Sequence, residues 1–208
     1  MLNLNLIQHC ANILGEILDF HGPADMKLSN YYREHGELGQ KDRGEIAECI
    51  YGIIRRLRFL KKINEDDSNY KKLVIAWLIK TEGRSIRELE HGLSKDEIEW
   101  AKSLKSRDTE NYTWPEKLSL PDWLWDLLVE QYGLEEAIDL GRSFLEPAKL
   151  DMRVNTIKIS RDDLVDQLAK EIADIEVMTY SPSGIRIARG TSLSRNKLFL
   201  EGKIEVQD

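Results

Sequence analysis

The sequence predicts a mainly helical bundle followed by a small α+β domain, with the boundary near Pro147. Apolar residues recur every three or four positions through most of residues 1–146, as in amphipathic helices. From about Leu150 they alternate with polar residues, which is the period of a strand. The chain has 208 residues, more than one typical domain length, so one large or two small domains are expected.

Composition places the chain among ordinary globular proteins. Hydrophobic residues make up 41% and charged residues 32%, with 13 Gly and 5 Pro, which excludes collagen-like and disordered classes. The apolar run from Leu73 to Ile79 is too short to span a bilayer, and the N-terminus lacks the basic region of a secretory signal. We therefore expect a cytoplasmic protein with no membrane partner. The net charge of −7 argues against non-specific nucleic-acid contacts over the whole surface.

The first three helices are predicted by their apolar stripes. One runs from Leu4 to Leu18 and is ended by Gly22-Pro23. A short second helix covers residues 24–35, and two glycines follow it. The third begins near Lys41 and is expected to continue as one helix, because its apolar residues fall within a narrow arc. These residues are Ile46, Ile50, Ile53, Leu57 and Leu60.

Four further features complete the bundle. The segment from Leu73 to Ile79 is apolar almost all round, so we expect its helix at the centre. Ser94 opens a helix with a capping signature, and residues 105–118 lack periodicity and are expected to form an exposed connector. Pro121 opens another helix, and Gly133 separates it from the last one.

The smaller domain is predicted as strand, helix and three strands. Leu150–Val154 has strand alternation, and Ser160 caps the helix after it. Residues 181–184 form a turn between the first two of the remaining strands. Those strands are expected at Ile175–Met178, Ile185–Ala188 and Ile204–Val206.

Few residue patterns point to catalysis or to a bound metal. Cys10 and Cys49 are expected to be core thiols in a reducing compartment. The histidines show no ligand spacing, so no metal is predicted; they are His9, His21, His35 and His91. No glycine-rich phosphate loop is present in the sequence, so a complete nucleotide enzyme is not expected.

Helical periodicity also accounts for most aromatic residues and paired carboxylates. The acidic pairs Asp162/Asp163 and Glu135/Glu136 are expected at helix starts. The aromatic residues that lie within helical patterns are expected in the core rather than on a stacking surface. They are Tyr51, Tyr70, Trp77, Trp100, Trp123 and Trp125.

Two basic stretches are candidate phosphate-binding surfaces. In the first, Arg55, Arg58 and Lys62 are predicted to share the face of one helix opposite its apolar stripe. The alternative is that these cations complement the negative end of the helix. Residues of the first strand extend the second stretch. The alternative interpretation of this stretch is that its charges are solvated and keep strand edges apart. The second stretch comprises Arg153, Asn155, Lys158, Arg186, Arg189, Arg195, Lys197 and Lys203.

Five segments, in order, resemble one protein family. They are residues 24–57, with Tyr51-Gly52-Ile53-Ile54-Arg55-Arg56-Leu57 at the end, Leu120-Pro121-Asp122-Trp123-Leu124, Arg153-Val154-Asn155-Thr156, Tyr180-Ser181-Pro182-Ser183-Gly184-Ile185, and the stretch from Phe199 to Asp208. Together they are similar to the N-terminal part of the Sun/Fmu (RsmB-like) family of bacterial ribosomal RNA cytosine-C5 methyltransferases.

The resemblance implies a fold and a role for each domain. Residues 1–146 would form a NusB-like helical RNA-binding domain, and residues 147–208 an RNA-recognition-like, ferredoxin-like α+β domain. In the family, a domain that binds S-adenosylmethionine and carries two catalytic cysteines follows. Cys10 and Cys49 do not stand in the Pro-Cys or Thr-Cys setting of those cysteines. We therefore expect these 208 residues to be a non-catalytic fragment without a cofactor, truncated before the methyltransferase domain.

The leading hypothesis is an RNA-positioning region of a 16S rRNA methyltransferase, whose partners are ribosomal RNA and the methyltransferase domain of the same protein. Phosphate contacts would come from Arg55, Arg58, Lys62, Arg153, Lys158, Arg186 and Lys203, with Asn155 bonding a base or ribose. A protein-interaction module of a transcription or ribosome-assembly factor is the alternative. A self-contained enzyme is the third option, and no constellation of nucleophile and base supports it.

Overall fold

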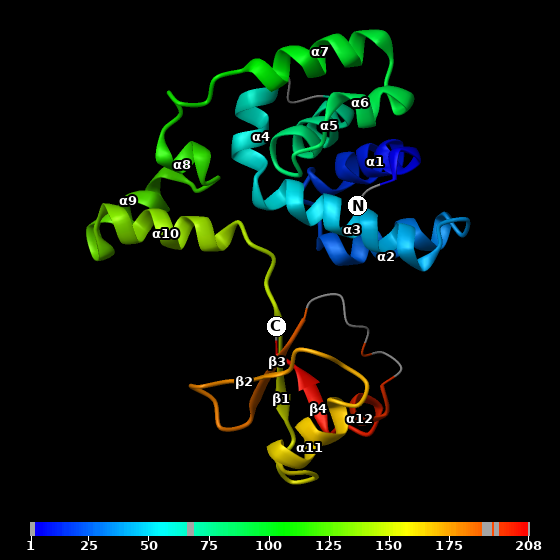
Figure 1. Cartoon of the computed structure of the whole chain (residues 1–208), viewed down its shortest axis with the longest axis vertical. Coiled ribbons are helices and arrows are strands. Elements are labelled where there is room, and N and C mark those ends of the chain that lie inside the picture. Colours follow the sequence, from blue (N-terminus) through cyan, green and yellow to red (C-terminus); the bar gives the residue numbers. More distant parts are fainter. Residues whose placement is uncertain (1–2, 66–68, 189–192, 194–195, 208) are drawn as a thin grey trace. The chain divides into compact units, whose positions relative to one another are not determined.

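The computed structural model describes residues 3–65, 69–188, 193 and 196–207 (Figure 1). The chain divides into two compact units, Met1–Glu146 and Pro147–Asp208, and each is described by itself. We call them the helical unit and the α+β unit. In the described ranges, no helix has the length and apolar character needed to cross a bilayer.

The helical unit is built from short helices joined by tight turns (Figure 1). Their bounds are η1 Leu4–Leu6, α1 Ile7–Ile17, α2 Ala24–Glu34, α3 Gln40–Arg55, α4 Leu57–Asn64, α5 Tyr70–Lys80, α6 Ile86–Leu89, η2 Glu90–Gly92, α7 Lys95–Ser106, α8 Trp114–Lys117, α9 Asp122–Tyr132 and α10 Leu134–Phe144. The sequence did not predict η2, α6 or α8, whose single turns are too short to show a period.

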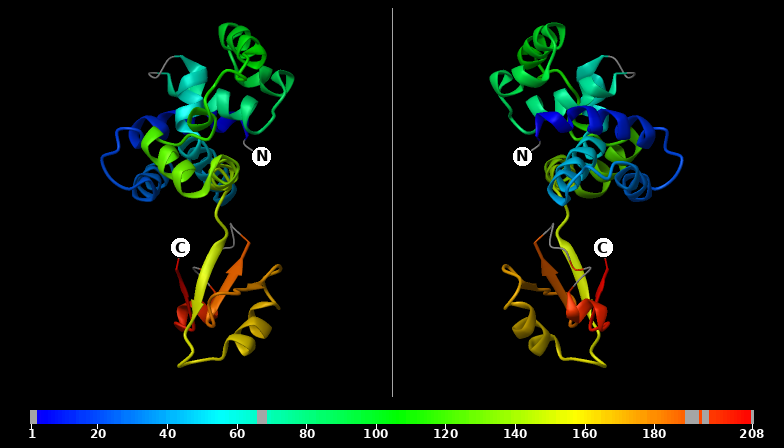
Figure 2. Two further views of the ribbon diagram at one scale, coloured as in Figure 1. Left: turned by 90° about the vertical axis from the view of Figure 1, so that its left-hand side faces the viewer. Right: turned by 90° about the vertical axis from the view of Figure 1, so that its right-hand side faces the viewer.

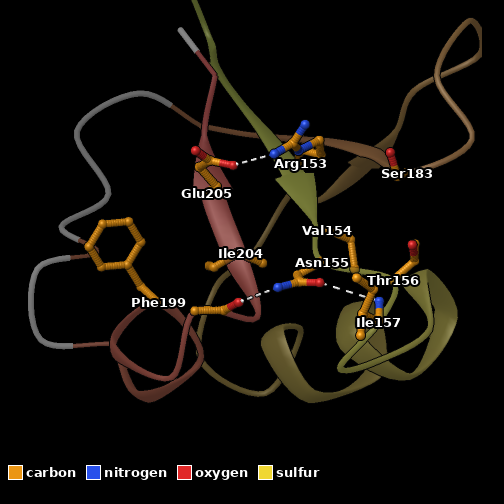
Figure 3. A pocket seen from close by; sticks show the side chains of 10 residues that line it. Arg153, Val154, Asn155, Thr156, Ile157, Ser183, Phe199, Ile204 and Glu205 are labelled. Atoms are coloured by element: carbon orange, nitrogen blue, oxygen red, sulfur yellow. Dashed lines mark hydrogen bonds and ion pairs between the residues drawn. The ribbon is translucent and has the colours of Figure 1, made fainter.

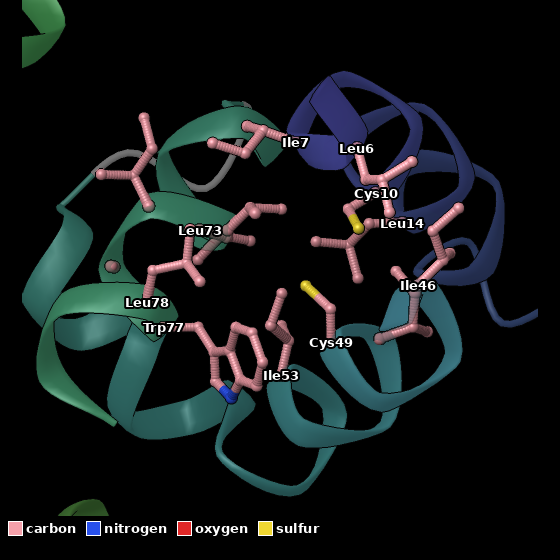
Figure 4. Packing of buried hydrophobic residues seen from close by; sticks show 14 of the residues in the cluster. Leu6, Ile7, Cys10, Leu14, Ile46, Cys49, Ile53, Leu73, Trp77 and Leu78 are labelled. Atoms are coloured by element: carbon pink, nitrogen blue, oxygen red, sulfur yellow. The ribbon is translucent and has the colours of Figure 1, made fainter. Parts of the chain in front are cut away.

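The centre of this unit is α5, as its apolar composition predicts. Every residue from Leu73 to Ile79 is buried, and α1, α3, α4 and α7 pack against this helix. Cys10 and Cys49 lie in the same core as free, buried thiols (Figure 4). Burial raises the pKa of the Cys49 thiol well above its usual value, so this sulfur stays protonated and packs as a small apolar group.

The prediction of one continuous third helix was wrong. Its apolar stripe is buried apart from the half-buried Leu57. The backbone, however, leaves the helical region at Arg56 (φ −116°, ψ 20°), and a separate helix, α4, begins at Leu57. Phe59 N–H donates 3.1 Å to Ser119 Oγ, so this amide has a tertiary partner. The local spacing of apolar residues cannot reveal a hydrogen bond between residues 60 positions apart.

The connector at 105–118 is more ordered than predicted. Its first two residues still belong to α7, and Thr113 opens α8 with a capping box. Pro115 and Leu118 are buried, so the prediction of an exposed connector was wrong for its second half. Tyr112 does dock on the bundle, edge-on to the ring of Phe59 at 6.2 Å between centroids.

One aromatic residue predicted as core lies at the surface. Trp123 is 65% exposed, and none of the residues of its helix, α9, is buried. This helix packs mainly against α10, so most of its circumference stays open. Of the other five aromatic residues predicted as core, Trp77 is buried and the rest are half-buried.

The α+β unit confirms the predicted fold class. Its elements are β1 Leu150–Val154, α11 Arg161–Leu168, β2 Glu176–Val177, β3 Gly184–Ile187, α12 Lys197–Leu200 and β4 Ile204–Val206. The strands form one antiparallel sheet in the order β2-β3-β1-β4. The single turn of α12 was not predicted.

The two faces of this sheet differ, as strand alternation requires. Met152, Val154, Ile185 and Ile187 are buried in one cluster with Leu164 of α11. The opposite face carries charged residues: Asp151 pairs in register with Arg186, and Arg153 with Glu205. The helices therefore cover only one face of the sheet (Figure 2).

Candidate nucleic-acid interface

The first predicted basic surface does not exist as one helix face. Arg55 ends α3 and its guanidinium lies 3.7 Å from Glu48, whereas Arg58 and Lys62 belong to α4. The break at Arg56 separates them, so the prediction of a shared face was wrong for its geometry.

The α4 cations have partners within the protein. Arg58 donates 2.5 Å to the carbonyl of Leu120 and lies 2.8 Å from Asp122. Lys62 donates 2.9 Å to Glu116. These contacts tie α4 to α8 and to the start of α9. Both cations are therefore occupied by tertiary partners. The alternative, that the cations complement the negative end of the helix, fits only Lys62 of the two, which lies in the last turn of α4.

The Lys62–Glu116 pair has a marked electrostatic signature. The hydrogen bond from Lys62, followed by the one from the backbone of Thr113, lowers the pKa of Glu116 to about 2. The same contact raises the pKa of Lys62. Glu116 is thus both a capping residue of α8 and the anion that holds Lys62.

Replacing Glu116 by Gln is expected to destabilise the helical unit at neutral pH. A carboxyl whose folded pKa is depressed contributes stability above its unfolded pKa and loses it as pH falls through the folded value. The stability gap between wild type and Glu116→Gln should therefore be constant above about pH 5 and close between pH 4.5 and 2. Urea titrations across this range measure it; a gap that persists at pH 2 would contradict the assignment.

Part of the second predicted surface borders a cavity of about 660 Å³ at the end of β1 (Figure 3). We call it the β1-end pocket. It is lined by Arg153, Val154, Asn155, Thr156, Ile157, Ser183, Phe199, Gly202, Ile204 and Glu205. Three of the predicted residues, Arg153, Asn155 and Lys158, lie in or beside it, and Lys203 adjoins its Gly202.

Asn155 shapes this pocket. Its side-chain amide donates 3.1 Å to the carbonyl of Gly202, and its oxygen accepts from Ile157 N–H at 3.3 Å. Its backbone N–H donates 2.8 Å to the carbonyl of Lys203. The side chain thereby joins the end of β1 to the turn before β4, and one amide hydrogen and one lone pair are left for a ligand.

The predicted arginines of the sheet differ in how firmly they are held. Arg153 and Glu205 lie 2.6 Å apart and are 58% and 61% exposed. Such an exposed pair contributes at most about 1 kcal/mol, so a phosphate can replace Glu205 as the partner. Arg186 instead makes two bonds to Asp151, of 2.5 and 2.7 Å, and the hydrogen bond lowers the pKa of Asp151. Asp151 therefore holds Arg186 against the sheet.

Two lysines border the pocket on the side of α12. Lys158 donates 2.7 Å to the carbonyl of Glu201, and Lys203 lies 2.8 Å from the carboxylate of the same residue. Lys158 is exposed, and its ammonium can leave a neutral carbonyl for a phosphate at small cost. Arg189 and Arg195, which the sequence also singled out, lie outside the described residues.

Sequence reasoning missed two exposed side chains of the α+β unit as candidate site residues. Ile157 is 96% exposed and Tyr180 is 99% exposed. Ile157 lines the β1-end pocket, and Tyr180 precedes the Ser-Pro-Ser-Gly turn, whose Ser183 also lines it. An aromatic residue immediately before a turn, outside any apolar period, was the signal available in the sequence.

Charge is unequally divided between the units. The helical unit has 20 basic and 27 acidic residues, and the α+β unit has ten of each. The whole net charge of −7 therefore resides in the helical unit. Long-range repulsion of an anionic polymer is accordingly weaker at the α+β unit.

A family model for the RsmF/B-like ferredoxin-like domain of methyltransferases matches residues 120–194. This part of the chain is similar to that domain. The matched residues begin just before α9, so the family's domain includes the α9–α10 pair as well as most of the α+β unit.

Two relatives extend the match beyond this RsmF/B-like domain. The chain is 24% identical to the probable ribosomal RNA small subunit methyltransferase B of Bacillus subtilis, over 83% of this chain and 45% of the relative. It is 32% identical to the protein of the same name from Synechocystis, over 49% of this chain and 23% of the relative. These findings confirm the resemblance to the N-terminal region of the Sun/Fmu family.

A solved structure titled "Crystal Structure of PH0851" shares the fold. Its TM-score is 0.65 at 15% identity, with 100% of this chain and 53% of that chain covered. This chain therefore spans about half the length of the solved protein and less than half of the two relatives.

Proposed function

We propose that this chain is the RNA-binding and substrate-positioning N-terminal region of an S-adenosylmethionine-dependent 16S rRNA cytosine-C5 methyltransferase. The observation that carries the proposal is the β1-end pocket, six of whose ten lining residues fall within the residues 120–194 that match the RsmF/B-like family model. The names of the two relatives, both probable small-subunit rRNA methyltransferases, support ribosomal RNA as the ligand.

The pocket offers the contacts that folded RNA needs. Arg153 and Lys158 at its rim can exchange exposed partners for phosphates, and Asn155 retains bonding capacity for a ribose or base. Tyr180 can stack on an unpaired base. The charged face of the sheet carries no aromatic side chain on its described strands, so we expect bases at the pocket rather than across the sheet.

Catalysis is proposed to reside in the part of the relatives that this chain does not cover. Methylation at cytosine C5 uses a thiolate that adds to C6 of the ring. Cys10 and Cys49 are fully buried in the helical core, and burial opposes ionisation of Cys49. Neither thiol can reach a cytosine, so this chain by itself is expected to bind RNA without transferring a methyl group.

Reversing one pocket charge should weaken RNA binding. We expect Lys158→Glu to lower the affinity for a small-subunit rRNA fragment about tenfold at low salt and to reduce the salt slope by about 1. Lys170→Glu is the matched control: Lys170 is also exposed and lies after α11, outside the pocket lining. Fluorescence titrations at several salt concentrations measure both, and equal losses in the two variants would contradict a pocket-centred interface.

A protein-interaction module is the second candidate, and one observation favours it. The α9–α10 pair exposes large apolar side chains, namely Trp123, Leu127, Tyr132, Leu134 and Phe144. Such a patch is typical of a protein contact. This candidate predicts a partner that stays bound after nuclease treatment and is lost in Trp123→Ser, with no effect of Lys158→Glu.

A further inference from the structure

His9, His35 and Glu37 meet at one end of the α1–α2 pair, although no ligand spacing in the sequence predicts it. His9 lies on α1, His35 is the C-terminal cap of α2, and Glu37 follows in the next turn. One ligand atom from each lies within 4.8 Å of the other two, the one such triad of His, Cys, Asp or Glu side chains in the described ranges. Folding thus brings His9 close to His35 and Glu37, which lie 26 and 28 residues further along the chain.

The hydrogen bonds of the two rings indicate which atoms a metal could use. His9 Nδ1 lies 2.9 Å from the hydroxyl of Tyr31, and His35 Nδ1 lies 2.9 Å from Oε1 of Glu37. With His9 Nδ1 donating to Tyr31, Nε2 of His9 presents a lone pair, and a metal that takes the place of the proton between His35 Nδ1 and Glu37 Oε1 is met by both of those groups. A hydrogen bond from one ring nitrogen to a carboxylate or hydroxyl is the arrangement that orients a metal-binding imidazole through the other.

Packing holds the two rings in place. The Tyr31 ring lies 4.1 Å from the His35 ring, and the two imidazoles are 5.1 Å apart and nearly perpendicular. Tyr31 is buried, whereas the histidines are half-buried and Glu37 is exposed. The cluster is therefore anchored on its inner side and open to solvent on its outer side.

We propose that His9, His35 and Glu37 form a binding site for a divalent transition metal, of which Zn²⁺ is the best match. Two imidazoles and one carboxylate are a common zinc ligand set, and water completes the tetrahedron. Zn–N and Zn–O bonds of about 2.0–2.2 Å bring ligand atoms to roughly 3.4 Å from one another, so small side-chain rotations must draw the triad together by up to about 1.4 Å.

The carboxylate suits this role electrostatically. Glu37 is exposed, and its Oε1 lies 2.9 Å from Nδ1 of His35, so both groups face the same point. As one of the three ligands, this carboxylate offsets part of the cation's charge. A bound metal would link α1 to the turn after α2 and stabilise the helical unit, independently of RNA binding.

The test uses the full chain, freed of metal by chelation and titrated with zinc alone. We expect one zinc per chain by calorimetry, and a rise in melting temperature of about 5–10 °C at a hundredfold excess over the dissociation constant. His9→Gln and His35→Gln should each weaken binding at least tenfold. His21→Gln and His91→Gln are the matched controls and should leave it unchanged.

Two further measurements separate metal binding from packing. Tyr31→Phe keeps the ring and removes the hydroxyl that orients His9, so it should weaken zinc binding about tenfold. Adding Co²⁺ to wild type should shift the imidazole signals of His9 and His35 and spare those of His21 and His91. Absence of saturable zinc binding, or binding retained in the His9→Gln/His35→Gln double variant, would overturn the proposal.

Discussion

Replacing Gly52 by Ala should destabilise the helical unit by about 1–3 kcal/mol. A β-carbon placed on Gly52 would lie 2.6 Å from Nε1 of Trp77 and 2.9 Å from its Cε2. Trp77 is buried within α5, at the centre of the core, and its ring has little room to move away. The contact between α3 and α5 therefore depends on the missing side chain at residue 52.

The same helix supplies the control. Gly44 also lies in α3, and a β-carbon there would meet nothing within 4 Å. Gly44→Ala should stabilise the unit by up to about 1 kcal/mol, because alanine has the higher helix propensity. Urea unfolding followed by tryptophan fluorescence measures both variants. Equal effects in the two variants would show that helix propensity, rather than the approach to Trp77, decides the outcome.

Tyr180→Ala is expected to weaken RNA binding by about 1–3 kcal/mol, roughly five- to hundredfold, if its ring stacks on a base. The side chain is 99% exposed, so its removal takes away no packing contact of consequence. Stability should change by less than about 0.5 kcal/mol. A large loss of affinity without a loss of stability would mark Tyr180 as a ligand contact.

Tyr132→Ala is the comparison for this variant. Tyr132 is also an exposed tyrosine but ends α9 in the helical unit. Its removal should leave RNA affinity unchanged. If Tyr132→Ala weakens binding as much as Tyr180→Ala, the interface extends over α9 and the pocket is not its centre. Titration of both variants with the same rRNA fragment decides between these outcomes.

The sequence predicted most elements of the fold because their signals are local. The all-apolar run from Leu73 to Ile79, the capping serines Ser94 and Ser160, and the alternation from Leu150 each specify one element within a few residues. The errors arise where a distant contact decides the structure. Ser119 bonds the backbone of Phe59, and α9 packs along only one side, which leaves Trp123 exposed.

The candidate sites were predictable only in part, for the same reason. The sequence named Arg153, Asn155 and Lys158, which the structure brings to one pocket. It could not show that Arg58 pairs with Asp122, 64 positions away, or that Arg186 is held by Asp151. Nor could it place His9 beside His35 and Glu37. Charge counts along a chain identify candidate phosphate-binding residues. Tertiary structure decides which of these residues already pair with another group of the protein.

Photo-crosslinking of the full chain to a small-subunit rRNA fragment, with crosslinked peptides identified by mass spectrometry, tests the proposed interface most directly. A β1-end pocket that binds RNA predicts crosslinks at residues 153–158 and at Tyr180, and their loss as salt rises. Crosslinks confined to the helical unit, with residues 153–158 and Tyr180 unmodified, would contradict it.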